Sequence, residues 1–212
     1  DASPENPMNL LEQYKEKINF VYKKFETNLG GVSLVQQWER CISLSSNEEW
    51  LMILGDDDIL GDNVVEAFYA NLDEILKEGS NVVRFASRVI DGSINFISKV
   101  YKHPKLENAY EFYFKKIKGQ VRSSLSEHIF KREVYIKQGF KNYPLAWHSD
   151  DYAWLSFANG KPIFCINEAL IEINVSLESI SGNQENSYQK NKAESLFFRD
   201  LVLSKLISIS KK

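Results

Sequence analysis

The run Trp50-Leu51-Met52-Ile53-Leu54-Gly55-Asp56-Asp57-Asp58-Ile59-Leu60 takes a short apolar stretch directly into three consecutive carboxylates. The apolar part has the length and make-up of a buried strand. Adjacent acids repel one another unless a positive charge sits among them, and a hard divalent cation prefers such oxygen ligands. At the carboxyl end of a strand, where open α/β sheets bind ligands, the cluster predicts a metal or ligand site. The alternative is structural, because Asp58 or Asp62 could cap the segment that follows.

Composition limits the class of protein. With 212 residues, 43% apolar and 26% charged, the chain is typical of an ordered globular domain. The net charge of −3 and the scattered lysines argue against a nucleic-acid binder. No stretch has membrane-spanning length and no signal peptide is evident, which predicts a cytoplasmic protein. Cys41 and Cys165 are expected to be small core residues in a reducing compartment. The first residue is Asp rather than Met, so we expect a processed, cut or engineered start.

The first half of the chain alternates between helical and strand patterns. Hydrophobic spacing and turn residues predict helix 9–17, strand 18–22, loop 28–31, helix 32–45, strand 50–54, helix 63–77 and strand 81–86. Such alternation predicts an α/β fold with a mostly parallel sheet flanked by helices.

The second half is less regular and adds a small antiparallel element. The patterns predict a hairpin over 89–100 around Asp91-Gly92, helix 107–116, strand 125–130, helix 132–138, helix 149–159, strands 161–167 and 170–175, and a long amphipathic helix 185–209. Because no repeat or linker interrupts the chain, residues 1–212 are expected to form a single domain.

Six short motifs follow one another along the chain. They are Asp1-Ala2-Ser3, the Asn28-to-Gly31 loop, Leu54-Gly55-Asp56-Asp57-Asp58, Phe130-Lys131-Arg132-Glu133 with Gly139-Phe140, Ser149-Asp150-Asp151-Tyr152, and the segment 171–181. In order and spacing they resemble the motifs of the family 2 glycosyltransferases, inverting enzymes with a Rossmann-like GT-A fold. The resemblance implies a nucleotide-sugar-binding half at 1–88, an acceptor-side half at 89–184 and a C-terminal helix at 185–212.

The chain departs from the family pattern at three places. The strand and loop with which the family normally begins have no counterpart here, so 1–88 lacks the usual first strand. Gly55 stands where the family commonly has an aspartate. Ser176, assisted by Asn174, stands where the family often has a metal-binding histidine.

The resemblance implies transfer of a sugar from a nucleotide-diphosphate donor, with Mg²⁺ or Mn²⁺, to an acceptor hydroxyl. Its implied residues are Asp57 and Asp58 for the metal; Asp1, Asn28, Gly30, Asp56 and Arg132 for the donor; Asp151, or alternatively Asp150, as the catalytic base; and Trp147 and His148 for the acceptor. Structural alternatives stay open: Asp150 could cap the helix at 149–159, Trp147 could be a core residue, and Arg132 could be a solvated charge. We expect His103 and His128 to be structural.

The leading hypothesis is an inverting glycosyltransferase of bacterial surface polysaccharide or glycan biosynthesis, with a glycan or lipid-linked acceptor. It would act in the cytoplasm, at the inner face of the membrane if the C-terminal helix contacts lipid. A catalytically inactive glycosyltransferase-like binding or scaffold domain is the alternative. A metal-dependent phosphoryl or nucleotidyl transferase is a third reading, but we find no clear phosphate-cradling glycine loop.

Overall fold

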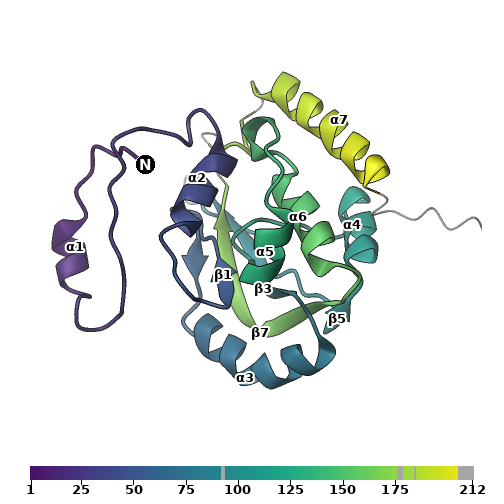
Figure 1. Cartoon of the computed structure of the whole chain (residues 1–212), viewed down its shortest axis with the longest axis horizontal. Helices are drawn as coiled ribbons and strands as arrows, with labels where there is room; N and C mark the ends of the chain where they lie inside the picture. Colours follow the sequence, from purple (N-terminus) through teal and green to yellow (C-terminus); the bar gives the residue numbers. More distant parts are fainter. Residues whose placement is uncertain (92–93, 176–178, 184, 205–212) are drawn as a thin grey trace, which may run out of the picture. The chain divides into compact units, whose positions relative to one another are not determined.

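The computed structural model describes residues 1–91, 94–175, 179–183 and 185–204. The chain divides into two compact units, Asp1–Asn47 and Glu48–Lys212, and the sheet lies in the second (Figure 1).

The first unit contains two helices, α1 (Met8–Glu12) and α2 (Leu34–Ile42). The Ser33 hydroxyl caps α2 by accepting a hydrogen bond from the Gln36 amide at 3.3 Å, and one face of α2 is buried at Val35, Trp38 and Ile42. The predicted strand 18–22 is wrong, because this stretch pairs with no strand in the described chain. Ile18, Val21 and Tyr22 are exposed, and an unpaired strand leaves its backbone groups to water.

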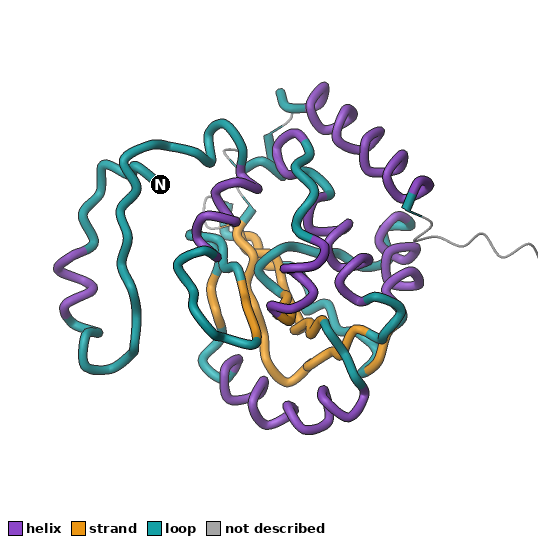
Figure 2. The backbone as a smooth tube through the Cα atoms, in the orientation of Figure 1, coloured by secondary structure: helices purple, strands orange, loops and turns teal. Residues whose placement is uncertain are grey.

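The second unit is built on one sheet. Its strands are β1 (Trp50–Met52), β2 (Ile59–Leu60), β3 (Val82–Asp91), β4 (Phe96–Ile97), β5 (Leu106–Glu107), β6 (His128–Lys131) and β7 (Ile163–Asn174). The order is β1-β6-β3-β7-β2, with β4 paired to β3 and β5 paired to β7. The sheet curls strongly into a half-barrel, and the curved path of the strands can be traced in Figure 2.

The predicted GT-A-type, mostly parallel Rossmann-like sheet is wrong. Among the described strand pairs only β3 and β7 run parallel, and all the others are antiparallel. β1 and β3 point the same way, as a strand-helix-strand alternation suggests. However, β6 lies between them and runs opposite to both, so neither of its pairings is parallel.

The helices of the second unit follow their local sequence signals. They are α3 (Val64–Glu78), α4 (Ala109–Ile117), α5 (Arg132–Gln138), a 3₁₀ turn η1 (Pro144–Ala146), α6 (Ser149–Ala158) and α7 (Ser187–Leu203). α3 ends as predicted at Gly79, whose φ of 67° is a left-handed conformation that glycine adopts without strain. α5 has the predicted bounds.

One prediction about the strands is confirmed, and another is corrected. The hairpin over 89–100 is confirmed by the pairing of Ile90 with Ile97, and its turn at Gly92 lies outside the described residues. The two strands expected over 161–175 are one long strand, β7. Its register against β3 shifts after Phe85, so that Ile166 and Leu170 oppose consecutive β3 residues.

Alternate side chains of β3 and β6 enter two different layers. Val83, Phe85 and Ile129 pack with α3 in one apolar core, while the neighbouring side chains Arg84 and Phe130 face the other way. Phe130 joins an aromatic layer with α5 and α6, formed with Tyr135, Phe140, Trp154 and Phe157. The layer that carries Arg84 also carries most of the buried charge.

Two further expectations can be compared with the structure. Cys165 is buried as expected, but the prediction for Cys41 is wrong, because this thiol is exposed on α2. No helix in the part of the chain that the structure describes is long and apolar enough to cross a bilayer.

Candidate functional site

The acidic loop, residues 53–58, is held at two points. The Gly55 amide donates a hydrogen bond of 2.9 Å to the Ser126 hydroxyl. Asp58 Oδ1 accepts a hydrogen bond of 2.9 Å from the Asn174 amide at the end of β7. The loop is therefore tied both to the segment before β6 and to the longest strand of the sheet.

Two carboxylate oxygens of this loop gather around Gly55. A Cβ at Gly55 would lie 2.9 Å from Asp58 Oδ2 and 3.4 Å from Asp57 Oδ1, so glycine leaves the space that both oxygens use. Partial burial, and then the charges of Asp58 and Asp56, raise the pKa of Asp57. The carboxylates are thus crowded in the manner that a cation would relieve.

The carboxylates of the acidic loop could hold Mg²⁺ or Mn²⁺ only together with oxygen atoms of a bound substrate. Mg²⁺ is commonly held by one or two carboxylates, waters and substrate phosphates. The described residues contain no group of three or more His, Cys, Asp or Glu side chains that could hold a metal by themselves. Asn174 contributes its backbone amide to Asp58, and Ser176 lies outside the described residues.

A second acidic group lies at the start of α6. Asp151 is 2% exposed, and both of its oxygens accept hydrogen bonds from Lys116 Nζ, at 2.5 and 2.6 Å. His148 Nδ1 lies 2.8 Å from Asp151 Oδ2. Burial alone would raise the pKa of Asp151, but the Lys116 charge and the His148 contact outweigh it and hold this pKa below its ordinary range. Asp151 is therefore ionised, with both oxygens engaged.

Asp150 differs from its neighbour. It is only half-buried, and burial together with the Asp151 charge raises its pKa to about 6, against the opposing charges of Lys116 and His148. A general base works best when its pKa lies near the operating pH. Because both Asp151 oxygens are engaged by Lys116 while Asp150 is partly exposed, Asp150, the alternative from the sequence, is the better candidate for a proton acceptor.

The backbone leading into α6 is strained. Leu145, Ala146 and His148 have φ values of 58°, 53° and 65°, a left-handed region that non-glycine residues seldom adopt. Such conformations cost of order 1–3 kcal/mol each and cluster at binding and catalytic sites. The strain sets the direction of the two residues predicted for the acceptor, Trp147 and His148.

Trp147 and His148 flank the start of α6. The Trp147 ring is half-buried and lies 5.7 Å from the His148 ring, centroid to centroid. Lys190 Nζ lies 4.8 Å from the Trp147 ring centroid. The His148 ring stacks on Phe197 of α7 at 4.8 Å. Both rings are thus ordered by α7, and Trp147 keeps part of its surface open.

One short segment contacts both the acidic loop and α6. Ser126 holds the acidic loop through Gly55, and two residues later the His128 ring stacks on Trp154 at 4.2 Å. Trp154 lies one turn along α6 from Asp151. Residues 126–128 therefore contact the loop after β1 on one side and Trp154 of α6 on the other.

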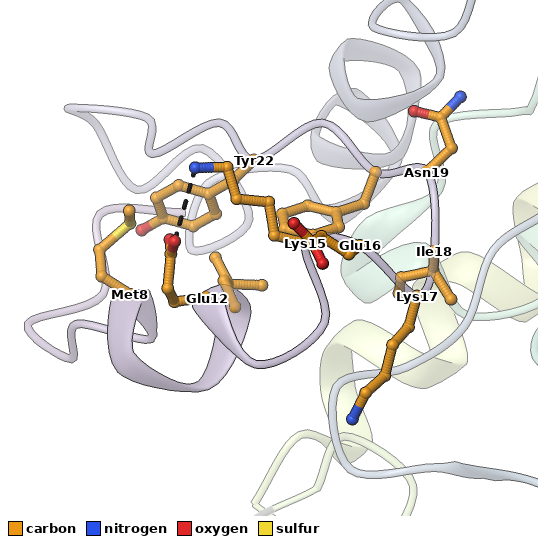
Figure 3. A pocket seen from close by; sticks show the side chains of 10 residues that line it. Met8, Glu12, Lys15, Glu16, Lys17, Ile18, Asn19 and Tyr22 are labelled. Atoms are coloured by element: carbon orange, nitrogen blue, oxygen red, sulfur yellow. Dashed lines mark hydrogen bonds and ion pairs between the residues drawn. The ribbon is translucent and has the colours of Figure 1, made fainter.

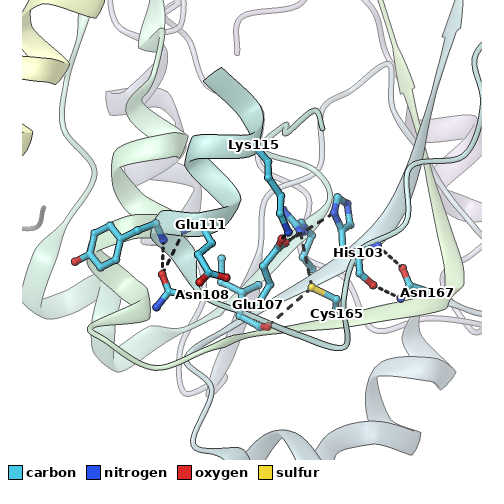
Figure 4. Close-up of polar contacts among 10 residues, drawn as sticks. His103, Glu107, Asn108, Glu111, Lys115, Cys165 and Asn167 are labelled. Atoms are coloured by element: carbon cyan, nitrogen blue, oxygen red, sulfur yellow. Dashed lines mark hydrogen bonds and ion pairs between the residues drawn. The ribbon is translucent and has the colours of Figure 1, made fainter. Parts of the chain in front are cut away.

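A buried charged cluster under α4 was not among the residues predicted from the sequence. Arg84 is 0% exposed, donates a 2.5 Å hydrogen bond to Glu107, and lies 4.0 Å from the centroid of the Phe112 ring. Lys115 also donates to Glu107 at 2.5 Å, and Figure 4 shows these groups beside His103. An arginine inside the apolar run Val82-Val83-Arg84-Phe85-Ala86 was the available signal.

His103 and His128, which we expected to be structural, are both buried. Burial, followed by the charges of Arg84, Lys115 and Arg122, lowers the pKa of His103 to about 3. Burial and the charge of Arg84 also lower the pKa of His128. Both side chains are neutral at pH 7.

The predicted donor residues of the first unit form a cluster of their own. Asp1 accepts hydrogen bonds from the Leu29 and Gly30 amides at 2.9 and 2.8 Å and also pairs with Arg40. Asn28 Oδ1 accepts a 2.7 Å hydrogen bond from the Gly31 amide. The Asp1 carboxylate thus anchors this loop.

Arg132 and the acidic loop are attached to opposite ends of β1. Arg132 donates to the backbone oxygen of Glu48 at 2.6 Å and to its carboxylate at 2.9 Å, just before the strand starts. The acidic loop follows the end of the same strand. The structure does not bring Arg132 beside the loop carboxylates.

A cavity of about 560 Å³ lies in the first unit, between α1 and the chain that follows it (Figure 3). Met8, Ile18 and Tyr22 line it and are largely exposed, and none of the predicted site residues borders it. A smaller cavity of about 330 Å³ is bordered by Asp1, Lys23 and Lys24. Neither contains the paired carboxylates of the second unit, so we place the candidate site at the acidic loop and the start of α6.

Comparison with known proteins adds no assignment: no protein-family model matches the chain, and no curated protein matches its sequence significantly.

Proposed function

We propose that this protein transfers a sugar from a nucleotide-diphosphate donor to an acceptor hydroxyl with inversion. The observation that carries the proposal is the presence of two different carboxylate groups in the second unit, one in the loop tied to Ser126 and one in the helix whose Trp154 stacks on His128. One gathers oxygens around Gly55, and the other keeps the protonatable Asp150 beside the ionised Asp151. The proposal rests on these sites and on the motif order, and not on the sheet topology.

The donor side of the proposal uses the acidic loop. Asp57 and Asp58 would hold Mg²⁺ or Mn²⁺, which as a Lewis acid would stabilise the negative charge on the departing diphosphate. Asp56 is exposed beside them and is our candidate for a contact to the donor. The hydrogen bond from Asn174 to Asp58 keeps the loop oriented before a donor arrives.

The acceptor side uses the start of α6. Asp150 accepts the proton of the attacking hydroxyl, a role that typically contributes 10²–10⁴-fold to a rate. Trp147 offers a partly open aromatic face against which a sugar ring can pack. A single displacement with the base on the face opposite the leaving group inverts the anomeric carbon. The natural pathway we propose is bacterial surface polysaccharide or glycan assembly, with a glycan or lipid-linked acceptor.

Calorimetry and a nucleotide-release assay test this proposal. Titration with common nucleotide-sugars, with and without Mn²⁺, is expected to show metal-dependent binding that Asp57→Asn weakens. Asp150→Asn is expected to bind donor normally but to lose at least about 100-fold in turnover. Asp73→Asn, the same change at an exposed position on α3, is the matched control and should alter neither quantity. The absence of metal-dependent binding for every donor would refute the proposal.

A second candidate is a binding or scaffold domain without catalysis. It is favoured by one observation, that no described set of three side chains can hold a metal unaided. Under this alternative a donor or glycan binds, but turnover is absent in the native protein and unchanged in the Asp150 variant. The same two assays therefore separate the candidates.

A further inference from the structure

Lys116 crosses from α4 to the buried carboxylate of α6. Its ammonium group donates to both oxygens of Asp151, whose side chain is 1% exposed, while the Lys116 side chain itself is 24% exposed. A lysine held by both oxygens of one carboxylate has a single position. The contact joins residues 35 positions apart, so it is a tertiary feature.

His148 contacts the same carboxylate from another direction. Its Nδ1 lies 2.8 Å from Asp151 Oδ2, and its ring is stacked on the fully buried Phe197. His148 has a left-handed φ of 65° in the turn just before α6. Lys116 of α4 and His148 of the strained turn before α6 thus both contact the Asp151 carboxylate. Phe197 of α7 packs against the His148 ring.

We infer that Lys116 is a positioning residue: it pins the Asp151 carboxylate and thereby leaves Asp150 as the carboxylate that takes the acceptor's proton. This inference rests on the proposed function. Two neighbouring acids in different environments divide the acid and base roles between them. Here Asp151 is the buried and paired member, and Asp150 is the half-buried one.

The bonds and the proton in the transfer step balance. The acceptor O–H bond breaks and its proton moves to Asp150. The acceptor oxygen forms the new bond to the anomeric carbon, and the bond from that carbon to the diphosphate breaks with its electron pair on the diphosphate. Asp150 then releases the proton to water.

Ionisable groups from four parts of the fold lie around the pair. Lys116 and Tyr113 come from α4, His148 from the turn before α6, and Glu194 from α7, while Glu127 and His128 lie in and before β6. Burial, and then the negative charges of Asp151 and Glu194, raise the pKa of Tyr113, which therefore remains neutral. Burial would lower the pKa of Lys116, but the Asp151 and Asp150 charges outweigh it, so Lys116 remains charged. The charges around Asp150 that can be altered by mutation are thus chiefly Lys116 and Asp151.

The test compares Lys116→Met, Lys116→Arg, Asp151→Asn and the double variant K116M/D151N. Lys118→Met, at the exposed end of α4, is the matched control. Two quantities are measured: the pH profile of turnover, and the titration of the Asp150 carboxyl by ¹³C NMR, which needs no turnover. Both are expected to move upward by about one pH unit in Lys116→Met and downward by a similar amount in Asp151→Asn, because a neighbouring charge shifts a pKa by this order. Lys116→Arg should largely preserve the profile, and Lys118→Met should leave it unchanged.

The double variant keeps the test decisive if Lys116→Met alone does not fold. Removing both partners avoids a buried unpaired carboxylate, which is what makes single removal costly. Lys116 lowers the pKa of Asp150 partly by its own charge, so Lys116→Met should still move the Asp150 titration upward in the Asp151→Asn background. If Lys116 also acts by holding Asp151, this upward shift should be clearly smaller than in the native background. An undiminished Lys116 effect in the Asp151→Asn background, or no effect in the native background, would overturn the inference. Titration shifts in a protein that transfers no sugar would instead overturn the proposed function.

Discussion

Replacing Gly55 by alanine tests whether the acidic loop depends on the space that glycine leaves. The new Cβ would lie 2.9 Å from Asp58 Oδ2, closer than real Cβ contacts, so the Asp58 side chain must turn. Its other oxygen is bound to the Asn174 amide, and the turn therefore breaks that hydrogen bond. The φ of Gly55 lies outside the left-handed region, so alanine adds no backbone strain there.

The expected loss of stability follows from two opposing effects. A hydrogen bond to a charged group contributes about 1.5–3 kcal/mol, with the lower value appropriate for a half-buried carboxylate. Replacing glycine by alanine returns about 0.4–1 kcal/mol by restricting the unfolded chain. The net destabilisation is about 1 kcal/mol, or a Tm decrease of about 2–4 °C for a unit of this size.

Urea and thermal unfolding of Gly55→Ala, Asp58→Ala and the double variant form the assay. If the alanine acts by displacing Asp58, the double variant should be no less stable than Asp58→Ala alone, because the hydrogen bond is already absent. Mn²⁺-dependent donor binding should weaken in parallel in Gly55→Ala. Additive losses of stability in the double variant would refute the reasoning, since they would show that Gly55 and Asp58 act independently.

Three further predictions concern the core. Arg84→Met should destabilise the protein by about 3–5 kcal/mol in urea unfolding, because it leaves the buried Glu107 without its arginine partner; a loss below about 1 kcal/mol would contradict this. Phe197→Ala should cost about 3–5 kcal/mol, whereas Phe198→Ala, at a position 41% exposed, should cost far less. His103, with its pKa lowered to about 3, stays neutral when folded but binds a proton when unfolded below its ordinary value of 6.5. Its contribution to stability is therefore present above pH 6.5 and is lost at about 1.4 kcal/mol per pH unit below it. The buried His128 contributes in the same direction. In unfolding measured from pH 7 to 5, His103→Leu should therefore reduce the slope by about 1.4 kcal/mol per pH unit.

Helices were the elements that the sequence predicted best. α3 ends at Gly79 and α5 spans the predicted 132–138, because hydrophobic period and glycine end signals lie within the helix itself. α6 began at the predicted Ser149 for the same reason. The long helix expected from residue 185 is described from Ser187 to Leu203.

Strand pairing was where the predictions failed. A strand's partner and direction depend on residues far away, so an apolar run says only that a strand is possible. The run at 18–22 found no partner, and β6 entered between β1 and β3 from more than 40 residues downstream of β3's start. Neither the missing partner of 18–22 nor the antiparallel insertion of β6 can be read from the local sequence, and both make the sheet less parallel than predicted.

The candidate site divides in the same way. By itself, the sequence determined that three carboxylates follow an apolar strand and that two more begin a helix, since neighbours in the chain are neighbours in space. Only the tertiary structure decided that Asp151 is buried and paired with Lys116 while Asp150 is half-buried, and that two loop oxygens converge on Gly55. Burial and the approach of distant charges set the protonation of these acids, and both arise only when the helices pack onto the sheet.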